Sequence, residues 1–503
     1  MVIGHWQLAI RVPTKSTLDT LRCPAHPPFT GARTHDICGH APTAAGFSSP
    51  LGPLPCSGPL GHPWQPRLDP RVSRPLGGRI RPRLFRCRAS EETRRRLPQI
   101  QLQRRPSGDA PAGRRLLQLQ LRPPNHQHRH QLRCPRRNHQ SLPHRTPRIE
   151  VHCWVVSHYI WSADKPPPQP GHIFNRHPEY LSKDSIGQKY IGKGYFLDPG
   201  HPDANQAVYN VARDIVSRYD IDGFHWDYCR YPTQDSGYND TAIKRFNEEF
   251  GLQGEPLPSD PKFCEWRRRQ VTDFLRWANA DLWEIKPSLV ISASAFSNIK
   301  DSYGYRLADW PAWNKEGIVD VCMPMDFSPD NRAVFFPRAD EALKNQGTRH
   351  VYIGQGAYMN TQENTLTQLE YIRQKGFPGT VFYDYRHPNQ GKLDQDGVFA
   401  FLKERFQPEW VQPPAMPWKK TKGIIKGTVI RAGTGTPVYN AVITLSTDPT
   451  RVQKTEPHGK FAFFDVSPGT YNVRAMFHGA DSAEQTVGFE PGQVVNLTFA
   501  LPP

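Results

Sequence analysis

From residue 149 onward, the chain alternates between short apolar runs and longer stretches in which apolar residues recur every three or four positions. Residues 205–219 and 265–287 show the longer spacing and predict amphipathic helices. Their apolar faces are expected to hold Val208, Val211, Ala212, Ile215, Val216 and Tyr219 in the first helix, and Val271, Phe274, Leu275, Ala278, Leu282 and Ile285 in the second. Strands that alternate with such helices predict a parallel sheet in an α/β fold.

The predicted strands of this sheet are the runs 149–156, 221–228, 289–296, 317–327, 350–358 and 379–385. Each ends in polar or aromatic residues, which favours a (β/α)₈ barrel over an open sheet, because barrels present their chemistry at the carboxyl ends of the strands. Two of the eight strands are not recognisable upstream. We therefore predict a barrel over 149–407 that is incomplete at its N-terminal side, with open sheet edges.

The C-terminal part follows another pattern. Residues 408–422 are rich in proline and predict a linker. The segment 423–503 then contains short runs, several of them alternating, separated by turns such as EPHGK and VSPGT, which is typical of a small antiparallel β-sandwich. Because this segment carries no cluster of carboxylates, cysteines or histidines, we expect an accessory module rather than a catalytic one.

The first 148 residues differ sharply in composition from the rest. They hold 26 Lys and Arg, 25 of them Arg, against six Asp and Glu, for a net charge of +20, whereas the remainder holds 38 against 41, or −3. They also contain 22 of the 51 prolines and show no sustained helix or strand period, so we expect this segment to be disordered. A nucleic-acid-binding function would therefore depend on this segment alone.

Three explanations of residues 1–148 compete. They are a basic arm that binds nucleic acid or an anionic surface, an inert extension, or translation of coding DNA in a wrong frame. The third accounts for 25 Arg beside one Lys and for the abrupt change at residue 149, and we favour it. His126, His128, His130 and Cys134 lack the spacing of a zinc site, so no metal is expected there.

The sequence gives little information on cellular location or on disulfide bonds. The opening MVIGHWQLAIRVPTKS lacks the basic start, apolar core and cleavage site of a signal peptide. No run approaches the roughly 18 apolar residues of a membrane span. Cys153, Cys229, Cys264 and Cys322 are scattered and predict no disulfide framework.

The stretch DIDGFHWDYCRYP at 220–232 concentrates candidate chemistry in a predicted core strand. Strand alternation places His225 and Asp227 on one face, with Asp227 at the carboxyl end. Asp222 lies near the amino end and is expected to cap backbone amides. The competing interpretation of Asp227 is a surface carboxylate paired with Arg230, but the flanking aromatic residues favour a partly enclosed site.

General acid/base chemistry requires a second carboxylate. Asp326 is the preferred candidate because its strand ends as that of Asp227 does, and Asp384 in FYDYR is the next, whereas Asp320 at a strand start is expected to be structural. Aromatic residues interleaved with acids and histidines are typical of a carbohydrate site. Two carboxylates also suit glycoside hydrolysis, at about 5–5.5 Å for retention and about 6.5–9.5 Å for inversion. The further candidate ligands of a sugar are His152, Trp154, Asp198, His225, Arg230, Tyr358 and Asp384.

A metal-dependent hydrolase is the rival enzyme class. The residues that would bind a cation are His152, Asp198, His225, Asp227 and Asp326. No close-spaced ligand pair occurs at a strand end, so we expect neither a metal nor another cofactor. Phosphate chemistry is disfavoured because no Gly-rich strand–helix loop is present.

Several motifs carry a family resemblance: HCWVV, GYFLDPGHP, RYDIDGFHWDYCRYP, WRRRQVTDFL, ADWPAWNKEGIVDVCMPMDF and IGQGAY. As a set they resemble the glycosyl-hydrolase-like family 10 of bacterial proteins over residues 149 to about 405. The resemblance implies a (β/α)₈ barrel that acts on glycans, usually in the cell envelope or outside the cell, with peptidoglycan-derived strands as one substrate class. The C-terminal motifs GTVIRAGTGTPVYNAVITL and GKFAFFDVSPGTYNVRA resemble a carboxypeptidase regulatory-like domain, a common accessory of secreted enzymes.

DGFHWD is also similar to the DGFRxD strand of alpha-amylase-type barrels, in which the final Asp is the nucleophile. Asp227 occupies that position. His225 stands where the amylases have Arg, and LVISASAFSN lacks their acid Glu, so the assignment of Asp326 as acid is our own inference.

We therefore predict a glycoside hydrolase with Asp227 as nucleophile or base and Asp326 as acid. The alternative is a non-catalytic glycan-binding barrel, and a nucleic-acid-binding protein is third. A carbohydrate is the expected partner, and no nucleic acid is expected. The expected location, outside the cytoplasm, follows from the resemblance alone.

Overall fold

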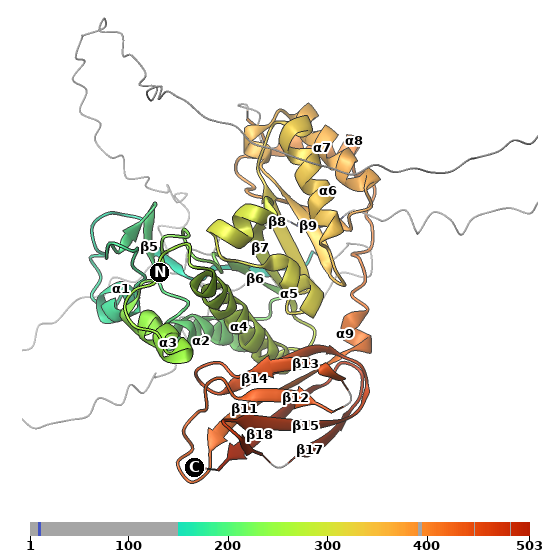
Figure 1. The fold of residues 1–503 in the computed structure, drawn as a ribbon. Coiled ribbons are helices and arrows are strands. Elements are labelled where there is room, and N and C mark those ends of the chain that lie inside the picture. Colours follow the sequence, from blue (N-terminus) through green and yellow to red (C-terminus); the bar gives the residue numbers. More distant parts are fainter. Residues whose placement is uncertain (1–8, 12–148, 391–394, 447, 483, 503) are drawn as a thin grey trace, which may run out of the picture. The chain divides into compact units, whose positions relative to one another are not determined.

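The computed structural model describes residues 9–11, 149–390, 395–446, 448–482 and 484–502 (Figure 1). The predictions made for residues 1–148, namely the disordered or basic arm, the wrong frame and the absence of a metal site, lie outside the described residues except at Ala9–Arg11, where the structure has a short strand. Residues from 149 onward belong to one compact unit of the chain.

The centre of this unit is a sheet in the order β1-β10-β9-β8-β7-β6-β2. Six of its strands are parallel and form a curled half-barrel: β2 (His152–Val156), β6 (Gly223–Asp227), β7 (Val290–Phe296), β8 (Val321–Asp326), β9 (His350–Gln355) and β10 (Gly379–Phe382). The short strand β1 (Ala9–Arg11) runs antiparallel along β10. The predicted α/β fold with an incomplete barrel is thus confirmed, and all six predicted strands are present.

The helices that connect the parallel strands are α2 (Pro202–Arg218), α3 (Asp240–Phe250), α4 (Pro261–Ile285), α5 (Trp310–Glu316), α6 (Phe336–Lys344) and α7 (Gln362–Gln374), and α8 (Gln395–Arg405) follows the last strand, β10. The largest apolar core lies between strands β6 to β9 and helices α2 and α4. None of the helices in the described part of the chain combines the length and the apolar content that a membrane span requires.

The apolar faces of α2 and α4 follow the predicted spacing with two exceptions. In α2 the buried stripe turns toward Asn205 and Tyr209, which leaves Val211 on the opposite flank with 38% of its surface exposed. Ile285 is the last residue of α4 and is 39% exposed, because it lies beyond the helix turns that cover the sheet. The prediction that these two side chains are buried is wrong.

Between β2 and α2 the chain forms a small antiparallel sheet in the order β3-β5-β4. Its elements are β3 (Tyr159–Trp161), β4 (Tyr190–Ile191) and β5 (Gly194–Phe196), with the short helix α1 (Ile173–Arg176) between β3 and β4. The backbone N–H of Ser157 donates to the carbonyl of Asp227 at 2.9 Å. This bond holds the beginning of the segment between β2 and α2 beside the end of β6.

The C-terminal part consists of two further sheets. The first has the order β14-β11-β18, and the second has the order β13-β12-β15-β16, with β17 paired to β15. The strands are β11 (Gly423–Arg431), β12 (Val442–Leu445), β13 (Asp448–Lys454), β14 (Lys460–Val466), β15 (Gly469–Phe477), β16 (Ala480–Asp481), β17 (Gln485–Phe489) and β18 (Val494–Leu501). β11 and β18 pair in parallel, so the prediction of a purely antiparallel module is wrong at that pair.

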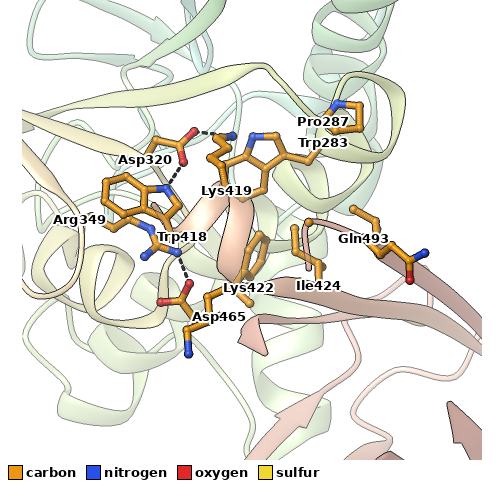
Figure 2. A pocket seen from close by; sticks show the side chains of 14 residues that line it. Trp283, Pro287, Asp320, Arg349, Trp418, Lys419, Lys422, Ile424, Asp465 and Gln493 are labelled. Atoms are coloured by element: carbon orange, nitrogen blue, oxygen red, sulfur yellow. Dashed lines mark hydrogen bonds and ion pairs between the residues drawn. The ribbon is translucent and has the colours of Figure 1, made fainter. Parts of the chain in front are cut away.

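The predicted linker contains the short helix α9 (Trp418–Thr421), which is bonded to the amino end of the parallel sheet. Trp418 Nε1 donates to Asp320 Oδ1 at 2.6 Å, and Lys419 Nζ lies 2.8 Å from Asp320 Oδ2 (Figure 2). Burial lowers the pKa of Lys419, against the opposing effect of Asp320. Arg349, whose guanidinium lies 4.6 Å from the centre of the Trp418 ring, forms an ion pair with Asp465, and these residues line a cavity of about 410 Å³ including its opening.

Candidate active site

A cavity of about 350 Å³, including its opening, lies on one face of the parallel sheet. It is lined by Trp154, His225, Asp227, Ser294, Met323, Met325, Phe327, Gly354, Val381 and Tyr383. The side chains on the other face of β6, Phe224 and Trp226, are fully buried in the main apolar core. The strand therefore turns its apolar side chains toward the helices and its polar side chains toward the cavity, as its sequence predicts.

Asp227, the last residue of β6, is held by several groups. Trp154 Nε1 donates to Oδ2 at 3.1 Å, and the backbone N–H of Tyr228 donates to Oδ1 at 2.7 Å. The hydroxyl of Ser294 on β7 also donates to Oδ1, and Arg230 Nη1 lies 3.5 Å from the same oxygen. Asp227 is only 5% exposed, so these contacts fix its carboxylate at the cavity wall rather than on an open surface.

His225 lies one layer below Asp227 on the same face. Its Nδ1 is 2.8 Å from the hydroxyl of Ser292 on β7. Burial lowers the pKa of His225 to about 4, although the nearby charge of Asp227 opposes this effect. The imidazole is thus neutral near pH 7, which suits it to hydrogen bonding rather than to proton donation.

Aromatic side chains surround the mouth of the cavity on the side of β8 to β10. The ring of Tyr383 lies 6.3 Å from Trp154, 5.4 Å from Phe327 and 5.6 Å from Tyr358, measured between ring centres. Tyr358 and Tyr383 are 37% and 42% exposed, so part of this aromatic cluster faces solvent. Exposed rings beside a buried carboxylate offer flat apolar surfaces to a ligand that also carries polar groups.

A second group of rings follows β6. Tyr228 has a φ of 57°, a left-handed conformation that costs a non-glycine residue about 1–3 kcal/mol. This backbone turn stacks Tyr228 on Tyr159 at 4.9 Å and places the guanidinium of Arg230 4.0 Å from the centre of the Tyr228 ring. Strain of this kind persists where the surrounding structure needs a particular side-chain direction.

Asp326 ends β8 but does not line the cavity. Its strand neighbours Met323 and Met325 do, so alternation directs Asp326 to the opposite face. There its Oδ1 lies 3.3 Å from the hydroxyl of Ser297 and 3.8 Å from Arg338 Nη1, and Oδ2 has no hydrogen-bond partner in the described part of the chain. Burial raises the pKa of Asp326 to about 7.

The remaining predicted site residues are spread over three places. Asp198 is fully buried and accepts hydrogen bonds from Ser182, Gly200 and Tyr231, so it supports the loop after β5 rather than the cavity. His152 lies at the start of β2, with its Nε2 3.1 Å from Glu150. Asp384 follows β10, two residues after its last position, and its pairing with His387 is one cause of its lowered pKa.

Two other predictions concern structural carboxylates, and both are confirmed. Asp222 Oδ2 accepts from the backbone N–H of Val151 at 2.9 Å, and Asp320 Oδ2 accepts from that of Ile291 at 2.9 Å. Sequence reasoning missed Ser292 and Ser294. Their spacing of two in an otherwise apolar strand was a usable signal, because it marks the polar face of β7.

Among the described residues, no group of three or more His, Cys, Asp and Glu is arranged to hold a metal ion. The five residues considered as metal ligands are divided between the cavity, the start of β2, the opposite face of β8 and the loop after β5.

Comparison with known families finds two matches. Residues 144–363 match the family model "Glycosyl hydrolase-like 10", and residues 424–502 match "Carboxypeptidase regulatory-like domain". Both resemblances predicted from the motifs are confirmed. The first match contains β2 to β9, and with them Asp227 and Asp326.

Among individual proteins, the chain is 22% identical over 210 residues to the glycosyl hydrolase DigH of Escherichia coli (strain K12), and the same match is found in Shigella flexneri. The match covers 37% of this chain and 44% of the relative, so the chain spans less than half the length of these curated relatives. The solved glycoside hydrolase domain of PgaB from Bordetella bronchiseptica aligns with 52% of this chain and 76% of that domain at 14% identity and a TM-score of 0.40.

Proposed function

We propose that this protein is a glycoside hydrolase that cleaves O-glycosyl bonds of a polysaccharide or a peptidoglycan-type glycan, with Asp227 as the nucleophile or base. The observation that carries the proposal is the place of Asp227: it lies at the carboxyl end of β6, in the cavity wall, beside the rings of Trp154 and Tyr383. The match of residues 144–363 to a glycosyl-hydrolase-like family supports the same reaction class.

The geometry suits each part of this chemistry. Aromatic faces stack on the apolar faces of sugars, and the neutral His225 can hydrogen-bond a hydroxyl group. The three donors to Asp227 fix the direction of its carboxylate, which favours in-line attack or the activation of a water molecule.

The proposal that Asp326 is the proton donor rests on its pKa. A carboxyl group with a pKa of about 7 is partly protonated at neutral pH, as a general acid must be. Its direction on β8 gives no support, because the cavity-lining residues of that strand are the methionines. Asp384 follows the cavity-lining Tyr383 in the chain and has a lowered pKa, which suits a sugar-binding carboxylate better than an acid.

A second candidate function is glycan binding without catalysis. It is favoured by one observation: of the described residues that line the cavity, Asp227 alone is a carboxylate. We further propose, from the family resemblance, that the protein acts outside the cytoplasm, in the cell envelope or beyond it.

The test is hydrolysis of peptide-free peptidoglycan strands and of neutral oligosaccharides by the full chain and by Asp227→Asn. We expect the substitution to reduce turnover by about 10²–10⁴-fold while binding persists. Asp214→Asn is the matched control, because this carboxylate is exposed on α2 in a surface pair with Arg218. Full turnover by Asp227→Asn would refute the catalytic role, whereas binding without turnover by the unmodified chain would support the glycan-binding alternative.

A further inference from the structure

Two arginines share one aromatic ring at the carboxyl ends of β6 and β7. The guanidinium carbon of Arg230 lies 4.8 Å from the centre of the Phe296 ring, and that of Arg306 lies 4.6 Å from it. Phe296 ends β7 and follows Ser294 by two positions, so it lies on the face of β7 that carries the cavity wall. The arginine pair thus lies one layer beyond Asp227, toward solvent.

The pair brings two positive charges together in a largely enclosed place. Arg230 is 7% exposed, and the side chain of Arg306 is 27% exposed. Burial lowers the pKa of Arg306, the charge of Asp301 opposes this effect, and the charge of Arg230 adds to it. The effect of Arg230 on this pKa indicates that the two charges repel each other, and a bound anion would balance them.

The protein's own carboxylates balance these charges only at long distance. Arg230 Nη1 lies 3.5 Å from Asp227, and Arg306 Nε lies 3.9 Å from Asp301, whereas close guanidinium–carboxylate hydrogen bonds measure about 2.7–2.9 Å. Nε of Arg306 is buried without a hydrogen-bond partner in the part of the chain that the structure describes. The protein's own carboxylates therefore leave both guanidinium groups incompletely paired.

Both side chains are held in place before any ligand binds. Arg306 donates through Nη1 to the carbonyl of Pro232 and packs over Tyr305 at 4.8 Å. Arg230 packs over Tyr228, whose backbone is left-handed, and Leu307, directly after Arg306, is also left-handed at a φ of 53°. Left-handed residues within two positions of each arginine indicate that the directions of both side chains are specified. A preorganised pair of this kind loses little entropy on binding.

We propose that Arg230 and Arg306 form a subsite for a carboxylate carried by the glycan that lies over Asp227. The inference rests on the proposed function, and it narrows the substrate class to acidic glycans. A carboxylate matches the planar guanidinium fork, which can hold it through two parallel hydrogen bonds. The subsite and the catalytic carboxylate would then bind neighbouring parts of one chain of sugars.

The experiment measures binding to the full chain carrying Asp227→Asn, so that turnover does not consume the ligand. The probes are peptide-free peptidoglycan strands, which carry lactyl carboxylates, and the same strands after chemical reduction of those carboxylates to alcohols. We expect the unreduced strands to bind at least about tenfold more tightly, as the loss of one charge-assisted contact implies. Adding Arg306→Gln should remove this preference by weakening the binding of the unreduced strands.

Two further variants separate the subsite from its alternatives. Lys300→Gln removes one positive charge, as Arg306→Gln does, but from an exposed position next to Asp301. It should preserve the preference for unreduced strands, which would exclude an effect of net charge alone. Arg306→Lys keeps the charge but loses the fork and should weaken the preference severalfold, and it replaces Arg306→Gln if that variant does not fold.

Equal binding of both probes, no binding of either, or an unchanged preference in both Arg306 variants would overturn the subsite. Hydrolysis by the unmodified chain is measured separately. A retained carboxylate preference without turnover would therefore refute the proposed catalysis and still support the subsite.

Discussion

Asp320→Asn is the sharpest test of how α9 is attached to the parallel sheet. The fully buried Asp320 accepts from Ile291 N–H at 2.9 Å and from Trp418 Nε1 at 2.6 Å, and it lies 2.8 Å from Lys419 Nζ (Figure 2). Asparagine keeps the shape of the side chain but removes its charge. Lys419 would then be a largely buried ammonium group without its counterion.

The expected cost follows from these contacts. Removing one partner of a buried ion pair destabilises proteins by about 3–5 kcal/mol. Lys419 keeps a hydrogen bond to the carbonyl of Leu289 at 2.6 Å and its place 4.1 Å from the Trp283 ring. We therefore expect the lower end, about 3 kcal/mol, or roughly a hundredfold in the unfolding equilibrium.

The sign of the pH dependence is also fixed. Burial already lowers the pKa of Lys419 in the folded state, and loss of Asp320 lowers this pKa further. A lysine that binds its proton less tightly when folded makes stability rise with pH. The defect of Asp320→Asn should therefore shrink as the pH rises from 7 toward the ordinary lysine pKa of about 10.4.

The assay is urea denaturation followed by tryptophan fluorescence at several pH values. Asp214→Asn, which breaks an exposed pair, should cost less than about 1 kcal/mol. The double variant Asp320→Asn with Lys419→Met removes both charges and should recover most of the loss. A cost for Asp320→Asn that is below about 1 kcal/mol and independent of pH would refute the reasoning.

Three other changes test predicted site residues and their neighbours. Burial raises the pKa of Asp326 to about 7, so the folded state binds this proton more tightly than the unfolded state does, and stability should fall as the pH rises from 4 to 7. In urea denaturation, Asp326→Asn should make the midpoint less dependent on pH over this range. An unchanged pH dependence would contradict the raised pKa. A methyl group at Gly223 would overlap the ring of His152, so Gly223→Ala should lower the free energy of unfolding by about 1–3 kcal/mol in the same assay. No change in stability would show that the His152 ring moves freely. Ser294→Ala removes one hydrogen-bond donor to Asp227 and should lower kcat about tenfold with little change in KM. A change in KM alone would assign Ser294 to substrate binding.

Much of the fold could be predicted because burial imposes periodicity. The stripe around Val208, Ala212 and Val216 and the six apolar runs correspond to elements of the structure. The direction in which two strands pair cannot be predicted from this periodicity. Alternation along 494–501 predicts a strand, but the same alternation fits a parallel or an antiparallel neighbour. For this reason the parallel pairing of β18 with β11 was not foreseen.

The site was predictable where a strand has one polar face. In β6, His225 and Asp227 alternate with Phe224 and Trp226, so the sequence specifies which side chains face the cavity. β8 has apolar residues on both faces, as buried parallel strands do, and its sequence therefore does not specify the direction of Asp326. Arg306 comes from a loop far along the chain, and only the three-dimensional structure brings it to Arg230.

The left-handed backbone at Tyr228 has a consequence for engineering and for natural variation. Replacement by glycine would relieve the backbone but remove the ring that contacts Tyr159 and Arg230. Selection for thermal stability alone would thus favour variants at this position that weaken the surroundings of Asp227. Stability and ligand recognition compete at a single residue, and the two can be measured independently there.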